Sequence, residues 1–426
     1  MHRRGLILVV LSCGAAFTAS CSTSHPTRSG IDASGGDGGA VVADDAPMEV
    51  SVHDSGPPPQ YCPDHLVQRS IADVALVIGM AAVTLESVAG VDVVGATLGT
   101  SYPGSGWMAW GVDRASGSVM TIAEIDGPWD TISSASDDTG ASFLLCENTS
   151  SGDCRRVRWD LGDGAATIDE IVLPDPLRFV IARRDASSDA LLRVIADPSG
   201  TSLERWDWPV RRTPSAERVG GAGLSDLRLG TYFGRPAITR LRSGEVALTV
   251  LATGGSYNEG RIVWLDPGLR TIVRATVYHA GALAARAGLQ ALPDDALLLA
   301  MTDSSGPAVR RVAADGTMIG ARVEMPWEPK AAAAGREDAF LIGTADRGLV
   351  VEDPGDPGEL THDTPLYLAR VHGDGPTIEG GGRPILTGDC YSVDAAAPAE
   401  GGVVIASTCV SAASVSLLYA CVPGVE

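Results

Sequence analysis

Cysteine is the residue type in this chain with the most evident chemistry. Eight cysteines occur, and two of them, Cys13 and Cys21, lie within the first 21 residues. The other six are Cys62, Cys146, Cys154, Cys390, Cys409 and Cys421. An even number of cysteines in an exported domain is typical of disulfides. None of the six stands at Cys-x-x-Cys or Cys–His spacing, so we expect disulfides and no metal site.

The surrounding sequence favours one set of pairings, although other pairings stay open. The favoured pairs are Cys146–Cys154, Cys390–Cys409 and Cys62–Cys421. The first pair flanks a polar turn and would staple a hairpin. The second stands at the ends of two strand-like segments. The third would join the first ordered strand to the last and lock a closed fold. In the chain-entropy model, a disulfide that closes so long a loop stabilises the folded state by up to ~5 kcal/mol.

Motifs for catalysis are absent from the sequence. There is no Gly-x-Ser-x-Gly nucleophile motif, no phosphate-binding loop and no EF-hand spacing of acidic residues. The histidines after residue 60 form no metal-type pair: His65, His279, His362 and His372. Adjacent carboxylates such as Asp294 and Asp295 could serve glycoside hydrolysis, but 53 acidic residues make such pairs common by chance. We therefore assign no catalytic residue, metal or cofactor and expect a non-enzyme, with an exported hydrolase or lyase acting on glycans as the alternative.

Two tryptophans are spaced so that they could bind a ligand. Trp206 and Trp208 stand at i and i+2, which places both side chains on one face of a strand. An exposed pair would stack on a sugar ring or a peptide. The alternative interpretation is that both rings fill gaps between repeats.

The N-terminal residues have the pattern of a secretory signal. Arg3 and Arg4 precede an apolar run over residues 5–17, and small residues precede Cys21. The run is short for a membrane span. This pattern resembles the lipobox of bacterial lipoproteins, which implies that residues 1–20 are a cleaved signal peptide and that Cys21 is lipidated and holds the protein to a membrane. Ser22 after this cysteine favours the outer membrane in family terms. An ordinary cleaved signal and an uncleaved anchor are the alternatives.

Residues 21–60 have the composition of a spacer. They are rich in Ser, Gly, Asp and Pro and contain no aromatic residue. Such a segment buries too little apolar surface to fold, so we expect a disordered acidic linker. The whole chain has a formal net charge of -21, which opposes binding to nucleic acid or directly to anionic lipid. We expect a lipid-anchored binding or scaffold protein of the cell envelope, with another envelope protein or a glycan as partner.

Residues 61–426 repeat one strand pattern. Pairs of strand-like segments meet at Asp- and Gly-containing turns, as at 309–323, 261–277 and 366–378. Short apolar runs between these hairpins, such as 247–251 and 403–406, predict buried inner strands. A unit of this kind every ~40–60 residues resembles the repeats of β-propellers. We therefore expect an all-β propeller of six to eight blades, with seven favoured and tandem β-sandwiches as the alternative. The Ala-rich residues 280–291 are compatible with a turn of helix.

Overall fold

The computed structural model describes most of the chain after residue 65, within a compact unit that covers residues 59–426. The described residues are 66–73, 82–98, 106–147, 152–185, 188–197, 200–208, 216–221, 223–224, 227, 236–254, 257–281, 286–334, 339–345, 349–351, 360–362, 364–372, 377–387, 390–409, 414–422 and 425. The expectations for the signal peptide, for Cys21, for the spacer and for Cys62 lie outside these residues.

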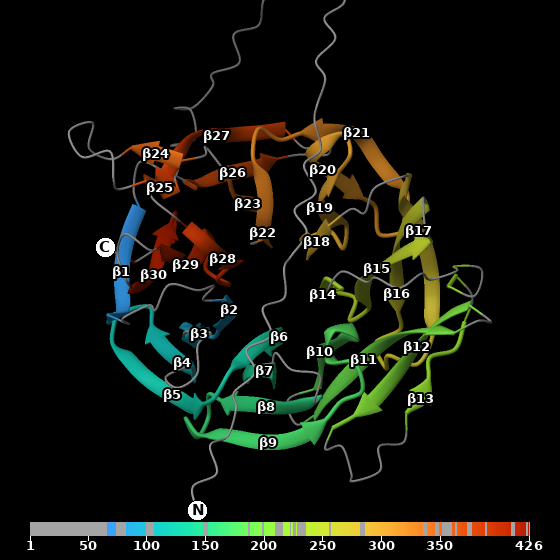
Figure 1. Ribbon diagram of the computed structural model, residues 1–426, viewed down its shortest axis with the longest axis horizontal. Helices are drawn as coiled ribbons and strands as arrows, with labels where there is room; N and C mark the ends of the chain where they lie inside the picture. The colour runs from blue at the N-terminus through green and yellow to red at the C-terminus, as the bar shows by residue number, and fades with distance from the viewer. Residues whose placement is uncertain are drawn as a thin grey trace, which may run out of the picture. The chain divides into compact units, whose positions relative to one another are not determined.

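Seven four-stranded antiparallel sheets surround a common centre and form a seven-bladed β-propeller (Figure 1). In the first five blades the strands follow the chain from the centre outward. Blade 1 is β2 (Val83–Val88), β3 (Val91–Leu98), β4 (Gly106–Asp113) and β5 (Val119–Asp126); blade 2 is β6 (Trp129–Asp137), β7 (Gly140–Glu147), β8 (Asp153–Asp160) and β9 (Ala166–Val172). Blade 3 is β10 (Phe179–Asp185), β11 (Ser188–Asp197), β12 (Gly200–Asp207) and β13 (Glu217–Arg218). Blade 4 is β14 (Ile238–Arg240), β15 (Val246–Gly254), β16 (Tyr257–Leu265) and β17 (Ile272–Gly281); blade 5 is β18 (Arg286–Ala291), β19 (Leu297–Asp303), β20 (Gly306–Val312) and β21 (Met318–Glu324). The predicted all-β fold and its seven blades are confirmed.

The last two blades depart from this simple order. Blade 6 consists of β22 (Glu328–Ala334), β23 (Ala339–Thr344), β26 (Leu366–His372) and β27 (Thr377–Leu386), with the hairpin β24 (Leu349–Val351) and β25 (Leu360–His362) inserted before its third strand. Blade 7 takes β28 (Cys390–Ala396), β29 (Val403–Cys409) and β30 (Ser414–Ala420) from the C-terminal end, and its outer strand is β1 (Leu66–Asp73). Because β1 pairs with β30, the two ends of the described chain close the ring within one sheet (Figure 1).

The hydrophobic core is divided among the gaps between the blades. Seven clusters of buried side chains each draw on two neighbouring blades, including the pair formed by blades 7 and 1. The second strand of a blade is buried on both faces, as in β7 and β29, because each of its faces meets a neighbouring blade. The closed ring therefore depends on seven separate packing interfaces, each between two sheets.

The structure corrects the expected repeat unit. The apolar runs at 247–251 and 403–406 belong to the second strands β15 and β29, so they are not the innermost strands of their blades. Each blade has one further strand at the centre. Residues 286–291, which were compatible with helix, form such an inner strand, β18. The inner strands were missed because one side of each faces the central channel, so their sequences lack a continuous apolar run.

Candidate functional site

The inner strands of all seven blades line a central channel. Its cavity has a volume of about 670 Å³, and its wall is formed by β2, β6, β10, β14, β18, β22 and β28 with some flanking residues. The lining side chains include hydroxyls, one amide and both signs of charge: Thr84, Ser133, Ser134, Ser136, Thr239, Gln290, Glu86, Asp394, Arg240 and Lys330. The channel is thus a polar cavity within the size range of small-molecule sites, roughly 300–1,000 Å³.

Side chains link the inner strand of one blade to that of the next at three of the blade boundaries. The backbone N–H of Ile181 donates to Ser133 Oγ at 3.2 Å, and that of Ala291 donates to Thr239 Oγ1 at 3.1 Å. At the boundary of blades 7 and 1, the N–H of Val83 donates to Ser392 Oγ at 2.9 Å. In each case the acceptor belongs to the earlier blade and the N–H to the following one. These bonds satisfy backbone donors that face the channel edge and have no strand partner there.

Asp394 occupies one of these linking positions with a carboxylate. Its Oδ2 accepts the N–H of Leu85 at 2.8 Å, and its Oδ1 accepts the N–H of Ala395 at 2.9 Å. Burial in the channel wall, aided by the nearby charge of Glu86, raises the pKa of Asp394 to about 7, although its two N–H donors oppose the shift. Glu86 Oε2 in turn accepts a hydrogen bond from Ser136 Oγ at 2.5 Å. We call the boundary that carries Asp394 and Glu86 the acidic seam.

The cationic side chains of the channel lie on other blades. Lys330, the only lysine of the chain, is on β22 of blade 6, and its Nζ lies 2.6 Å from Glu328 Oε2. Lys330 stands where the register of β22 against β23 shifts between Pro329 and Ala331, which marks a β-bulge. Such bulges re-aim side chains near binding sites. Arg240, at the end of β14 in blade 4, is exposed at the channel wall.

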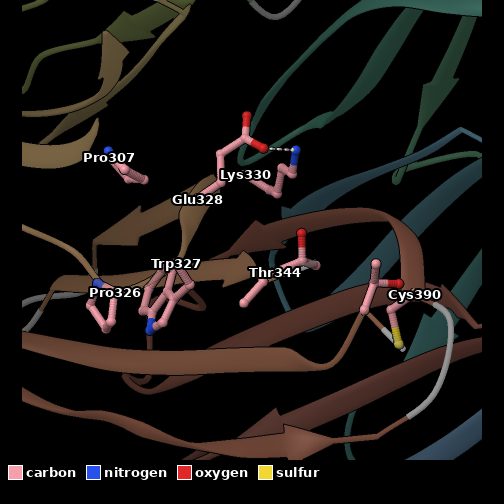
Figure 2. A pocket seen from close by; sticks show the side chains of 9 residues that line it. Pro307, Pro326, Trp327, Glu328, Lys330, Thr344 and Cys390 are labelled. Atoms are coloured by element: carbon pink, nitrogen blue, oxygen red, sulfur yellow. Dashed lines mark hydrogen bonds and ion pairs between the residues drawn. The ribbon is translucent and has the colours of Figure 1, made fainter. Parts of the chain in front are cut away.

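A smaller pocket shares Lys330 with the channel wall. It has a volume of about 390 Å³ and is lined by Pro307, Pro326, Trp327, Glu328, Lys330, Thr344, Ala345, Thr364 and Cys390. Figure 2 shows the Glu328–Lys330 ion pair beside the pocket, with Trp327 and Cys390 on opposite sides. Trp327 is almost fully buried and stacks on Tyr367 with 5.9 Å between ring centroids, so it provides a firm apolar wall. Because Cys390 is disulfide-bonded, the pocket presents no thiol from this residue.

The disulfide between Cys146 and Cys154 is confirmed. These residues face each other on β7 and β8, with 4.0 Å between their Cα atoms. Cys390 and Cys421 are also disulfide-bonded. The strand register places Cys390 opposite Cys409, as the predicted pairing requires. The expected partner of Cys421 lies outside the described residues.

The proposed stacking pair of tryptophans needs correction. Trp206 and Trp208 are both buried, in the core cluster between blades 2 and 3. Trp206 packs edge-on against Phe179, while Trp208 donates to Asp169 Oδ2 at 3.1 Å and lies under the guanidinium of Arg156. The rings fill an inter-blade gap, which was the alternative interpretation, and offer no exposed face to a ligand.

The remaining candidates from the sequence lie away from the channel. Asp294 accepts the N–H of Ala296 and pairs with Arg311, whereas Asp295 accepts the N–H of Arg242 at 2.6 Å, so this carboxylate pair organises turns. His279 Nδ1 is 3.6 Å from Asp303 Oδ2 between blades 4 and 5. In the part of the chain that the structure describes, no group of three or more His, Cys, Asp or Glu side chains could hold a metal ion. Over the same residues, no helix has the length and apolar character needed to cross a bilayer.

Comparisons with known proteins add little beyond the fold. No protein-family model and no curated protein matches the chain. Among solved structures, Sqt1 from Chaetomium thermophilum is 11% identical with a TM-score of 0.42, covering 83% of this chain and 99% of its own. A protein of unknown function from Dyadobacter fermentans is 12% identical with a TM-score of 0.41, covering 69% and 97%.

A prolyl endopeptidase is also similar, at 13% identity and a TM-score of 0.41. The match covers 80% of this chain, but the chain spans only half of the endopeptidase. Likenesses this distant transfer no activity. The strand topology alone therefore identifies the described chain as a seven-bladed β-propeller.

Proposed function

We propose that this chain is an exported, lipid-anchored binding protein and that the central channel is its ligand site. The observation that carries the proposal is the cavity of about 670 Å³, to which every blade contributes. A polar cavity built from seven rigid inner strands is pre-organised, so binding requires little ordering of side chains or loops. The wall offers hydroxyl, amide, carboxylate and cationic groups, which suits a small polar ligand better than an apolar one.

The export part of the proposal rests on the sequence. The leader before Cys21 resembles a lipoprotein signal, and the disulfide of β7 and β8 is typical of an oxidising compartment. Mass spectrometry of the mature N-terminus tests this directly. We expect an acylated Cys21, and Cys21→Ala should release the protein from membranes. A mature chain that begins at another residue without acyl groups would remove the anchor from the proposal.

The ligand site can be tested by filling the channel. Gly288 lines the channel, and a Cβ added there meets only the Cβ of Ala300, at 3.8 Å. A Gly288→Trp variant should therefore fold and place an indole in the cavity. Gly162, in the turn between β8 and β9, has no atom within 4 Å of an added Cβ and provides the matched control Gly162→Trp.

The experiment is a thermal-shift screen of small polar metabolites against the full mature chain, followed by calorimetry of the hits. We expect ligands that stabilise the wild type and Gly162→Trp but not Gly288→Trp. Hits that stabilise all three proteins equally would place binding elsewhere, and a screen without any hit would count against a small-molecule site.

One observation favours hydrolysis as a second candidate function. Asp394 and Glu86 stand on adjacent inner strands, and the pKa of Asp394 is raised to about 7. Glycosidases use two carboxyl groups of which one stays protonated near neutral pH. Both oxygens of Asp394, however, already accept backbone N–H groups. Release of reducing ends from cell-envelope glycans, abolished by Glu86→Gln, would establish this function; glycans left intact by the wild type would exclude it for those substrates.

A further inference from the structure

We propose that the smaller pocket, which blades 5, 6 and 7 form together, is a second ligand site that binds a neutral sugar ring through two neighbouring hydroxyl groups. The site is separate from the ligand site proposed in the channel, although Lys330 lines both cavities. Three features of the described residues carry the proposal: a buried hydroxyl without a partner, an ion pair with unused hydrogen-bonding capacity, and an apolar wall beside them.

The first feature is the hydroxyl group of Thr344. This residue ends strand β23, lines the pocket and is only 9% exposed (Figure 2). Among the residues that the structure describes, the Thr344 side chain has no hydrogen-bond partner. A buried hydroxyl left without a hydrogen bond costs about 1–3 kcal/mol. A ligand in the pocket would make that bond.

The second feature is the Glu328–Lys330 ion pair beside Thr344. Glu328 lies directly opposite Thr344 in the register of β22 and β23, and Lys330 stands at the β-bulge two residues further on. Lys330 Nζ donates to Glu328 Oε2 at 2.6 Å, which uses one of the three N–H groups of the ammonium. Glu328 is the only partner of Lys330 within the described part of the chain, so two donors remain for a ligand. The side chains of Lys330 and Glu328 are 29% and 33% exposed, so a ligand can reach them.

The hydrogen-bonding groups of the pocket match two neighbouring hydroxyls of a sugar. An ammonium group only donates hydrogen bonds, a carboxylate only accepts them, and a hydroxyl does both. One sugar hydroxyl can therefore accept from Lys330 while its neighbour donates to Glu328, and Thr344 can bond to either. The ion pair has no net charge, and the described lining holds no other charged residue. This balance favours a neutral ligand over an anion or a cation.

The third feature is the apolar side of the pocket, which Pro307, Pro326 and Trp327 line (Figure 2). Trp327 is held in place by its stacking on Tyr367. The C–H groups of a sugar ring can pack on this wall while the hydroxyls of the ring face the ion pair. A few polar groups that orient the ligand beside an apolar lining are typical of small-molecule sites, and the volume of about 390 Å³ suits one ring.

Ligand-observed NMR titrations of the full mature chain test the class of ligand. The neutral probes are the methyl pyranosides of glucose, galactose and mannose, glucuronate is the anionic probe, and alanine is the zwitterionic one. We expect at least one methyl pyranoside to bind with a Kd of about 1 mM or below, and more tightly than glucuronate or alanine. Failure of all three pyranosides to bind, or tighter binding of glucuronate or alanine, would overturn the inference. Methyl disaccharides then distinguish a glycan end, which binds with its chain attached, from a free sugar.

Variants that fill a cavity locate the site. Ala345 lines the pocket and is partly exposed, so Ala345→Trp should fill the pocket and abolish pyranoside binding. Ala115→Trp, in the exposed turn between β4 and β5, is the matched control and should bind as the wild type does. Gly288→Trp fills the channel and should also leave pyranoside binding unchanged. Loss of binding in Gly288→Trp alone would place the sugar in the channel, which would overturn the pocket site but support the proposed function.

Polar variants test the role of each group. Glu328→Gln and Lys330→Met should each weaken pyranoside binding about tenfold, because each removes a charged hydrogen-bond partner. An anion site would instead bind its ligand more tightly in Glu328→Gln. Thr344→Val should weaken binding about fivefold without lowering the melting temperature, because the hydroxyl it removes has no partner among the described residues. Unchanged affinity in these three variants would contradict the pocket as the sugar site.

Discussion

Asp394 should make the stability of this propeller fall as pH rises through neutrality. In the unfolded chain its carboxyl group titrates near pH 4. In the folded chain, burial in the channel wall and the charge of Glu86 raise the pKa of Asp394 to about 7. The folded state therefore holds the proton more tightly, and the stabilisation is complete only below the unfolded pKa. Linkage between pH 5.5 and pH 8 gives a loss of about 2 kcal/mol from this one group.

Urea denaturation of the wild type and of Asp394→Asn, measured across this pH range, tests the prediction. At pH 5.5 the folded Asp394 is mostly a protonated carboxyl group, whose two oxygens can still accept the Leu85 and Ala395 N–H groups. An asparagine side chain has one oxygen, so we expect the variant to be about 1 kcal/mol less stable at this pH. The readout is the difference between the two proteins in how steeply the free energy of unfolding changes with pH, because other titrating groups contribute equally to both. Wild type should lose about 2 kcal/mol more than the variant by pH 8.

Glu86→Gln provides an internal check on the cause of the shift. Removing its charge should lower the pKa of Asp394 and reduce the extra slope, while burial maintains part of it. Identical pH dependence in wild type and Asp394→Asn would refute the reasoning, because the carboxyl group would then titrate at the same pH in the folded and unfolded chains.

Three further variants test the interfaces between strands and blades. Arg114→Ala should lower the free energy of unfolding by about 3–5 kcal/mol in urea denaturation, because it removes the Nε–H that both oxygens of the fully buried Asp92 accept at the interface of blades 7 and 1; a loss below about 1 kcal/mol would argue against that role. Trp206→Ala should lower the free energy of unfolding by about 3–5 kcal/mol, because it opens a cavity against Phe179. Calorimetry should show unchanged ligand affinity in this variant, and a changed affinity would indicate that Trp206 contributes to binding. Replacing both Cys146 and Cys154 by serine should lower the free energy of unfolding by about 2.5 kcal/mol, since the disulfide closes a loop of sequence separation 8. A wild-type melting temperature that does not fall when reductant is added would contradict this prediction.

The sequence was most informative where a strand is buried on both faces or ends in a tight turn. The second strands are continuous apolar runs, and their hairpin partners end at residues such as Asp113, whose carboxylate accepts the N–H of Ser116. These signals are local, so the presence of a strand repeat, the all-β class and the Cys146–Cys154 disulfide could be predicted, but the innermost strand of each blade could not. The pairing of β1 with β30 leaves no local pattern, because the two strands lie at opposite ends of the chain, and the sequence indicated this closure only through the expected Cys62–Cys421 disulfide.

The candidate site was less predictable for the same physical reason. Asp394 and Glu86 are more than 300 residues apart in sequence, and only ring closure brings β28 beside β2. Neither residue stands in a motif, and each is one of 53 acidic residues. Trp206 and Trp208 show the opposite difficulty: their spacing is that of a shared strand face, but the spacing does not say whether that face meets solvent or the next blade. That Asp394 links two inner strands as Ser133 and Thr239 do in other blades is visible only in the folded structure.

The pairing of β1 with β30 has a mechanical consequence. The N-terminal segment leaves the propeller from β1, and the same strand completes the last sheet. Tension along that segment would act first on the strand pairing that begins with Leu66 opposite Ala420. Pulling this strand away would expose the edge of β30 and open the ring at one place, so under the proposed lipid anchor the strand that receives the force is also the strand that closes the ring.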